Sequence, residues 1–405
     1  MTAASAVAGC TGFLGDDEVT VQVNGDEQSF PAGEVANYWH DFADGEQEDF
    51  ESYVGEFNGL GDAKVNESAV AKLQERLTTA IPAGDGPHAF GWAHDWLGNF
   101  EGRDFLYDAS DDLNVDLGVY QETGQNAVTW DGGVYGLPYA SETVTLMVNT
   151  ELTDVLPETV DEMVDVMEDF HDPDAGQYGL SYPVDAYFVS AWLHAFGGFY
   201  FDDDEGLGVD SPEVAEGLEF LVDNLWEYQP QDPDYGTQAS VFADGNAPFA
   251  INGPWELGSF RGDIGEENLE VLTLPTIDGD NAPAPYSGIQ MWYFADAMNE
   301  ATDEQLESAI EFAEWYTTNE NVIVSNANNH GFIPIHAEFE DSDELDPAVE
   351  AYAGSVAMGT PMPADDRMDQ VWEPTEDAII RVLNGEQGAQ ESLDEAAETI
   401  RSNWE

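Results

Sequence analysis

Residues 91–100, GWAHDWLGNF, place a His-Asp pair between two tryptophans. His94 and Asp95 are residue types that could form a catalytic dyad or half of a metal site. Trp92 and Trp96 could instead form a stacking surface for an uncharged ligand. The rest of the chain has to decide among these three kinds of site.

No other motif supports the dyad or the metal site. None of the seven histidines stands in HxH or HExxH spacing, and the chain has no CxxC pair, no GxSxG elbow and no P-loop. Gly59-Leu60-Gly61 lacks the third glycine of a dinucleotide fingerprint, and the acidic turn Asp202–Gly206 lacks the spacing of an EF-hand. We therefore expect no metal and no cofactor, and we expect His94 to be structural.

Acidic residues dominate the composition. The 405-residue chain has 85 Asp and Glu against 8 Lys and Arg, a formal net charge of −77. In dilute buffer such a surface repels itself, whereas molar salt shortens the Debye length to about 3 Å and screens the repulsion. The acids are spread between apolar periods, which favours adaptation to saturated salt, as in a haloarchaeon, over an acidic tail or a calcium buffer. Eight scattered basic residues exclude nucleic acid as a partner.

The single cysteine, Cys10, ends the small-residue run Val7-Ala8-Gly9-Cys10. One cysteine excludes a disulfide framework. The run is typical of a lipobox, so we predict that Cys10 is the lipidated first residue of an exported protein. The alternative is an inert thiol in a tail, because no basic segment, full apolar segment or twin-arginine precedes it. No later stretch approaches the roughly 18 continuous apolar residues of a transmembrane helix.

The spacing of apolar residues along the chain predicts strands that alternate with helices. Helices are expected near Gln47–Phe57, over Ala69–Ile81, after the N-cap Ser211 and after the N-cap Thr302. Strands are expected at Val19–Val23, Val35–Trp39, Leu146–Val148, Pro248–Ile251, Leu269–Leu274 and Trp292–Ala295. The alternation favours parallel sheets covered on both faces, and the length favours two lobes.

Four aromatic residues stand just beyond short apolar runs or turns: Trp92, Tyr187, Trp255 and Trp372. Loops at the carboxyl ends of strands face the ligand crevice of an open α/β sheet. Aromatic faces pack against the apolar faces of pyranose rings, and carboxylates accept hydrogen bonds from sugar hydroxyls. A site that combines aromatic and acidic side chains with few basic ones favours a neutral polyol as its ligand over a phosphate or an organic acid.

Several short motifs occur in a fixed order along the chain. They are GDGP at 84–87, WAHD at 92–95, YGLP at 135–138, DAYF at 185–188, NGPW at 252–255, LPT at 274–276 and MP at 362–363. Over about residues 35–404, this ordered set resembles the maltose/maltodextrin-binding proteins of ABC importers, within the family 1 solute-binding proteins.

The resemblance implies an α/β fold of two Rossmann-like lobes joined by a hinge, the type II periplasmic-binding-protein fold. It implies closure over a sugar and no catalysis. The domains expected from it are residues 1–34 ahead of the lobes, 35–142 with about 274–340 as the N-terminal lobe, and 143–273 with about 341–405 as the C-terminal lobe. The hinge is expected near Glu142–Thr145 and Leu269–Leu274.

The resemblance also implies the site residues. The stacking aromatics of the family fall on Trp92, Tyr187, Trp255 and Trp372, and its hydroxyl-binding acids fall on Asp95, Glu142, Asp185 and Asp44. Three basic residues usual in the family are replaced here, by Gly45, by Trp96 and near Glu376. Our hypothesis is that Trp96 supplies ring stacking where the family has an arginine.

These inferences predict an extracellular, lipid-anchored, monomeric receptor that captures maltose or a maltodextrin and delivers it to ABC permease subunits. One alternative is a binding protein for another neutral sugar or polyol, such as trehalose. The other is a glycoside-processing enzyme that uses Asp95 or Glu142. Paired carboxylates occur by chance in so acidic a chain, so a glycosidase pair has little support.

Overall fold

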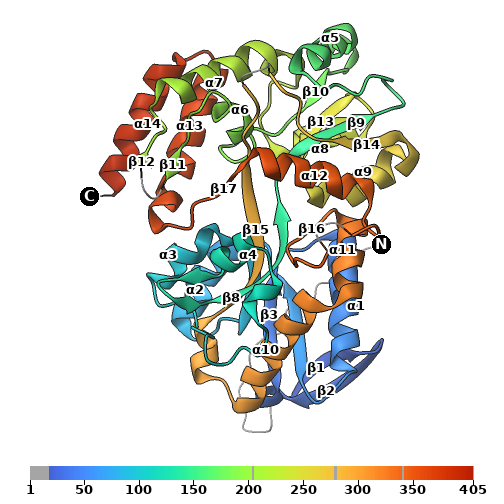
Figure 1. Ribbon diagram of the computed structural model, residues 1–405, viewed down its shortest axis with the longest axis vertical. Coiled ribbons are helices and arrows are strands. Elements are labelled where there is room, and N and C mark those ends of the chain that lie inside the picture. Colours follow the sequence, from blue (N-terminus) through green and yellow to red (C-terminus); the bar gives the residue numbers. More distant parts are fainter. Residues whose placement is uncertain (1–17, 203–204, 278–280, 340–341, 405) are drawn as a thin grey trace.

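Two lobes, each built around a β-sheet, make up the described part of the molecule (Figure 1). The structure is a computed structural model that describes residues 18–202, 205–277, 281–339 and 342–404. Residues 1–17, which belong to the predicted N-terminal segment 1–34 and include the predicted lipidation site Cys10, lie outside the described residues.

The larger sheet, in the N-terminal lobe, has the order β16-β8-β15-β5-β3-β4, with β17 paired to β15. Its strands are β3 (Val35–His40), β4 (Lys64–Ala69), β5 (Ala89–Ala93), β8 (Gly136–Glu142), β15 (Tyr286–Phe294), β16 (Ile333–Pro334) and β17 (Thr360–Pro361). β3, β4 and β5 are mutually parallel, and β15 is antiparallel to both β5 and β8. The carboxyl ends of β3, β5 and β8 therefore meet at one edge of the sheet.

The smaller sheet, in the C-terminal lobe, has the order β10-β13-β9-β14. Its strands are β9 (Thr145–Asn149), β10 (Leu180–Ser181), β13 (Phe249–Asn252) and β14 (Leu269–Leu272). Along β9, Leu146 and Val148 face one core and Met147 faces the other. Burial on both faces explains why this strand reads as a continuous apolar run.

Both sheets are mixed, so the prediction of parallel sheets was wrong. The chain leaves the larger sheet at the end of β8, enters the smaller one as β9, and returns after β14 as β15. A strand that returns from the other lobe runs opposite to the strand that left, and β15 is accordingly antiparallel to β8. The second crossing follows β14, between Leu272 and Tyr286.

Helices cover both faces of each sheet, as predicted (Figure 1). The N-terminal lobe has α1 (Asp44–Asn58), α2 (Leu73–Ala80), α3 (Leu97–Glu101), α4 (Glu122–Ala127), α10 (Asp303–Thr318) and α11 (Glu320–His330). The C-terminal lobe has α5 (Val160–Phe170), α6 (Ser190–Leu193), α7 (Pro212–Asn224), α8 (Tyr235–Ala243), α9 (Leu257–Ile264), α12 (Pro347–Met358), α13 (Trp372–Leu383) and α14 (Ala389–Asn403). Among the described residues, no helix is long and apolar enough to cross a bilayer.

Two helices begin at the residues that the sequence predicts. Ser211 Oγ accepts the Val214 N–H at the start of α7, and Thr302 forms a capping box with Gln305 at the start of α10. The helix predicted over Ala69–Ile81 is shorter, because Ala69 still belongs to β4 and α2 begins only at Leu73.

A hairpin of β1 (Glu18–Val23) and β2 (Asp26–Pro31) precedes the larger sheet. Its turn residues Asn24 and Gly25 have φ values of 52° and 85°, the left-handed conformation that a two-residue Asn-Gly turn requires. The Asn24 N–H donates to the Gly55 carbonyl of α1 at 2.9 Å. This part of the predicted N-terminal segment therefore packs onto the N-terminal lobe.

A β-bulge lies between β8 and β15, where Gln290 and Met291 pair with Ala140 and Pro138 and leave Tyr139 of β8 as the extra residue. Ile289 before the bulge and Trp292 after it face the same core, although their positions differ by three and an unbroken strand would point them to opposite faces. Bulges re-aim side chains locally, and Gln290 here lies in the wall of a cavity between the lobes.

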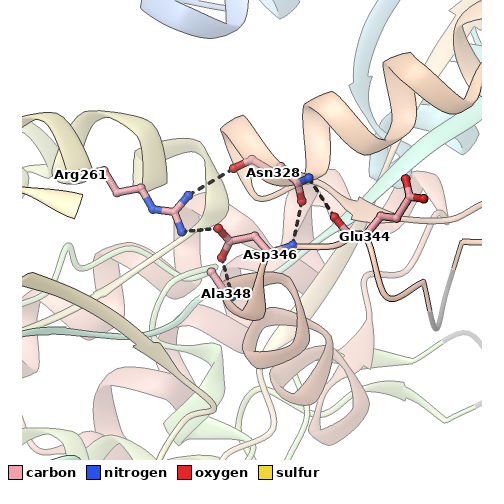
Figure 2. Close-up of polar contacts among 5 residues, drawn as sticks. All are labelled: Arg261, Asn328, Glu344, Asp346 and Ala348. Atoms are coloured by element: carbon pink, nitrogen blue, oxygen red, sulfur yellow. Dashed lines mark hydrogen bonds and ion pairs between the residues drawn. The ribbon is translucent and has the colours of Figure 1, made fainter. Parts of the chain in front are cut away.

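Arg261 on α9 joins the two lobes (Figure 2). It donates to the carbonyl of Asn328 on α11 at 3.2 Å and to the carboxylate of Asp346, the N-cap of α12, at 2.9 Å. Asn328 accepts the Asp346 N–H at 2.7 Å and donates to the Glu344 carbonyl at 3.0 Å. The cluster thus ties one helix of the N-terminal lobe to two helices of the C-terminal lobe.

Candidate ligand-binding site

A cavity of about 880 Å³ is lined by residues of both lobes. The N-terminal lobe contributes residues 41–46 after β3, the end of β5 and the end of β8. The C-terminal lobe contributes the segments that follow β10 and β13 and the start of α13. A ligand in this cavity would touch both lobes.

Strand direction brings the carboxylates of the N-terminal lobe together. Asp41 directly follows β3, Asp95 lies two residues after β5, and Glu142 is the last residue of β8. Since these strands end at the same edge of the sheet, their side chains open into one crevice. Asp44 and Glu46, in the first turn of α1, complete this acidic wall.

The opposite wall carries an acid and aromatic rings. Asp185 and Tyr187 follow β10, Trp255 lies in the turn after β13, and Trp372 is the first residue of α13. The N–H of Phe188 donates to Asp185 Oδ1 at 2.7 Å, which fixes the direction of that carboxylate.

Eight of the nine predicted ligand-binding residues line the cavity: Asp44, Trp92, Asp95, Glu142, Asp185, Tyr187, Trp255 and Trp372. Trp96 is the exception, and its placement corrects our expectation. Its side chain is buried, with 7% exposure, and its ring stacks on Trp92 with centroids 4.5 Å apart and planes 17° apart. Phe100 stacks on the far side of Trp96 at 5.4 Å. Trp96 supports the stacking ring and does not face the ligand space itself.

His94 is structural, as predicted. The Ile289 N–H donates to its Nδ1 at 3.1 Å, so Nε2 carries the ring proton and donates to the Met362 carbonyl at 2.9 Å. Burial lowers the pKa of His94 to about 4, against the opposing hydrogen bond to Met362. Both ring nitrogens are occupied, which leaves neither a base nor a metal ligand.

Sequence reasoning missed ten polar residues of the lining: Asp41, Glu46, Tyr139, Ser141, Tyr235, Glu256, Ser259, Gln290, Asn329 and His330. Asp41 could have been predicted, because it follows the expected strand Val35–Trp39, and residues just beyond the carboxyl end of a strand face the ligand crevice. Tyr139 and Gln290 lie within strands and meet across them, with Tyr139 Oη donating to Gln290 Oε1 at 3.1 Å. Their placement depends on register and on the bulge at Tyr139 of β8, for which the sequence carries no signal.

Burial shifts the cavity carboxyls toward their neutral forms. It raises the pKa of Asp95 to about 8, with Glu142 adding to the shift, and that of Glu46 to about 8, with Asp41 adding. It raises the pKa of Glu142 to about 7, against a hydrogen bond from Gln290. Asp95 Oδ1 and Glu46 Oε1 have no hydrogen-bond partner among the described residues. The cavity therefore presents acceptors that hydroxyl groups of a ligand can satisfy.

The described residues of the lining include no lysine or arginine. An anionic ligand would meet uncompensated repulsion from the carboxylates. A neutral polyhydroxyl ligand could donate to the carboxylates and stack on the aromatic rings. Within the described ranges, no three His, Cys, Asp or Glu side chains are grouped so that they could hold a metal ion.

Residues 52–353 match the family described as bacterial extracellular solute-binding protein, a match that covers well over half of the chain. The chain belongs to this family. This solute-binding protein is also 36% identical over 353 residues to the maltotriose-binding protein of Pyrococcus abyssi, with 85% of this chain and 76% of the relative covered.

Two solved structures resemble this solute-binding protein along most of its length. A cyclo/maltodextrin-binding protein complexed with maltotetraose matches with a TM-score of 0.74 at 27% identity, over 91% of this chain and 97% of that one. The maltose/maltodextrin-binding domain of Bdellovibrio bacteriovorus bound to maltotriose matches with a TM-score of 0.81, over 91% and 99%. At 19% identity the second likeness shows the fold alone. The predicted two-lobed, periplasmic-binding-protein-like fold is confirmed.

Proposed function

We propose that this solute-binding protein captures a maltodextrin-like oligosaccharide between its lobes and delivers it to an ABC permease. The observation that carries the proposal is the cavity, which combines stacking aromatics and carboxylates from both lobes with no lysine or arginine among its described lining residues. The 36% identity to a maltotriose-binding protein supports a glucan of that kind as the ligand.

Ligand binding would favour the closed arrangement of the lobes. Trp92 and Glu142 belong to the N-terminal lobe, and Tyr187 and Trp255 belong to the C-terminal lobe. A sugar gains contacts from both sets only when the cleft is closed, so it shifts the population toward that form. The lobes would divide near residues 142–143, 273–274 and 340–341, and the closed form would dock on the permease.

The proposal includes an extracellular, monomeric receptor held at the membrane by a lipid on Cys10. Family membership supports the extracellular location, and the small-residue run that ends at Cys10 supports the anchor. Cys10→Ser is expected to release the protein from the membrane fraction into the medium. A Cys10→Ser variant that stays with the membrane would contradict the lipid anchor.

Calorimetry in multimolar KCl tests the ligand assignment directly. Maltose and maltotriose are expected to give binding heat and a change in tryptophan emission, because three indoles line the cavity. Trehalose and a linear polyol complete the panel. If trehalose or the linear polyol gave the strongest binding heat, the protein would be a receptor for another neutral solute. No response to any glycan would overturn the proposal.

We propose further that the bound sugar is not turned over. Membership in a solute-binding family supports this. Maltotriose recovered intact after long incubation at high protein concentration is the expected result, measured by chromatography. Release of glucose that disappears in Asp95→Asn or Glu142→Gln would favour the glycoside-processing enzyme instead.

A further inference from the structure

Contacts on three sides fix the ring of Trp255. Its indole Nε1–H donates to the Tyr235 hydroxyl at 2.9 Å. Phe188 meets it edge-on, with ring centroids 6.1 Å apart and planes 79° apart. Gly253 lies so close beneath it that a Cβ at that residue would overlap the ring carbons.

Tyr235, the first residue of α8, is held in turn by Glu256. The Tyr235 hydroxyl donates to Glu256 Oε1. An ionised carboxylate only accepts hydrogen bonds, so the tyrosine proton is directed at Glu256 and an oxygen lone pair is left for the indole N–H. Burial raises the pKa of Glu256, and the hydrogen bond from Tyr235 opposes that shift.

The three residues form a closed chain of contacts. Glu256 follows Trp255 directly in the turn Pro254–Glu256, and Tyr235 lies on a separate helix. Glu256 is therefore linked to Trp255, its neighbour in the chain, through the side chain of Tyr235 on another element. This geometry couples the position of α8 to the direction of the Trp255 ring.

We propose that Glu256 is a positioning residue for ligand binding, which acts through Tyr235 to hold the ring plane of Trp255 before the ligand arrives. The ligand side of this inference rests on the proposed function. A ring that is already fixed loses less conformational freedom on binding, so its stacking contributes more to affinity. The same arrangement commits the tyrosine proton to Glu256, so a ligand group that faces the Tyr235 oxygen has to be a donor.

Near-ultraviolet circular dichroism of the empty protein tests the positioning. The difference between the parent protein and Trp255→Phe defines the signal of the Trp255 ring. Glu256→Ala and Tyr235→Phe are expected to lose most of that signal. Glu256→Gln is expected to keep it, because the amide oxygen still accepts the tyrosine proton.

Maltotriose titrations then test the effect on affinity. Glu256→Ala loses one hydrogen bond and is expected to bind maltotriose roughly 3- to 10-fold more weakly than the parent. Glu256→Gln keeps that hydrogen bond, so its affinity is expected to stay within about 2-fold of the parent. Glu219→Ala, an exposed acid on α7, is the matched control and should change neither readout.

Three outcomes would overturn the proposal. The Trp255 signal could persist in Glu256→Ala, which would show that the ring is fixed without the acid, whatever happens to affinity. Glu256→Gln could lose the signal as Glu256→Ala does, which would remove the acceptor role. The signal could vanish while affinity stays at the parent value, which would show that ring position does not matter. If the parent binds no maltotriose, the proposed function fails, yet the spectra of the empty protein still decide the role of Glu256.

Discussion

Two aromatic rings in the cavity are supported from behind by different means. Trp92 rests on Trp96, which rests on Phe100, so a stack of three rings forms one wall. Trp255 lies against the bare backbone of Gly253 and is held at its edge by hydrogen bonding. Rigid backing keeps each ring plane fixed, which is what stacking on a sugar face requires.

Removing the ring behind Trp92 is expected to affect both stability and binding. Trp96→Ala should lower the free energy of unfolding by about 3 kcal/mol, because it empties a buried site. It should also weaken maltotriose binding, since Trp92 loses its stacking partner. Thermal unfolding and calorimetry in the same salt measure the two effects. Trp96→Phe keeps a ring and is the control, and unchanged affinity in Trp96→Ala would rule out the supporting role.

Asp95 makes stability depend on pH in a defined direction. Burial raises its folded-state pKa to about 8, against roughly 4 in an unfolded chain. The folded protein thus keeps a proton that the unfolded chain releases between about pH 4 and 8, so the free energy of unfolding falls as pH rises through that window.

Asp95→Asn tests this linkage. The variant should match the parent near pH 4 and exceed its stability by about 1 kcal/mol or more at pH 9, because no buried charge forms. At pH 9, where Asp95 of the parent is ionised, the variant should bind sugar more weakly, since the amide offers one acceptor oxygen where the carboxylate offers two. Thermal unfolding followed by circular dichroism across pH gives the comparison, with the exposed Asp85→Asn as control. Parallel pH profiles for parent and variant would refute the assignment.

At the scale of elements, the short turn after β5 determines which of its residues reach the ligand space. His94–Trp96 form one turn of 3-10 helix, in which successive side chains point about 120° apart. Asp95 therefore enters the cavity, His94 turns toward Met362, and Trp96 turns behind Trp92. The sequence shows the residue types of this turn but not their directions, which is why Trp96 was expected in the cavity.

Periodicity predicted β3 and β13, two of the strands that lead into the cavity, and capping residues predicted two helix starts, whereas β5, β8 and β10 were not among the expected strands. The strands at residues 35–39, 146–148 and 248–251 and the helix starts at Ser211 and Thr302 follow from local pattern. Strand direction does not follow from local pattern. The pattern of apolar residues reflects only which faces of a strand are buried, and a parallel and an antiparallel strand can share the same pattern. The bulge at Tyr139 and the meeting of Tyr235 with Glu256 depend on register and on packing between distant segments.

The contacts of Arg261 are expected to contribute more to the free energy of unfolding than a surface ion pair does. Its side chain is 19% exposed and bridges α9, α11 and the N-cap of α12, so Arg261→Met should lower the free energy of unfolding by about 1–2 kcal/mol. Arg401, 50% exposed in its pair with Asp210, is the matched control. Arg401→Met should cost less than about 1 kcal/mol. Equal melting temperatures for the two variants would contradict a structural role for the Arg261 cluster.

For the whole molecule, the net charge of −77 sets the conditions under which the fold persists. Self-repulsion among 85 acids is weakened when added salt shortens the Debye length from about 10 Å to about 3 Å. The melting temperature is therefore expected to rise steeply between 0.1 M and multimolar KCl. Circular dichroism melts across this range measure it. A melting temperature independent of salt would contradict the interpretation of the charge as an adaptation to high salt.

The passage of the chain from β8 into β9 and back from β14 into β15 means that neither lobe is an unbroken stretch of polypeptide. No single gene fragment therefore encodes one whole lobe, because each lobe is assembled from segments that lie apart in the chain. Conversely, a protease that nicks the chain between Glu142 and Thr145 separates the polypeptide into two fragments that stay joined through the larger sheet, because β5 and β8 of the first fragment pair with β15 of the second. The nicked protein would travel as one particle on a native column and as two bands on a denaturing gel.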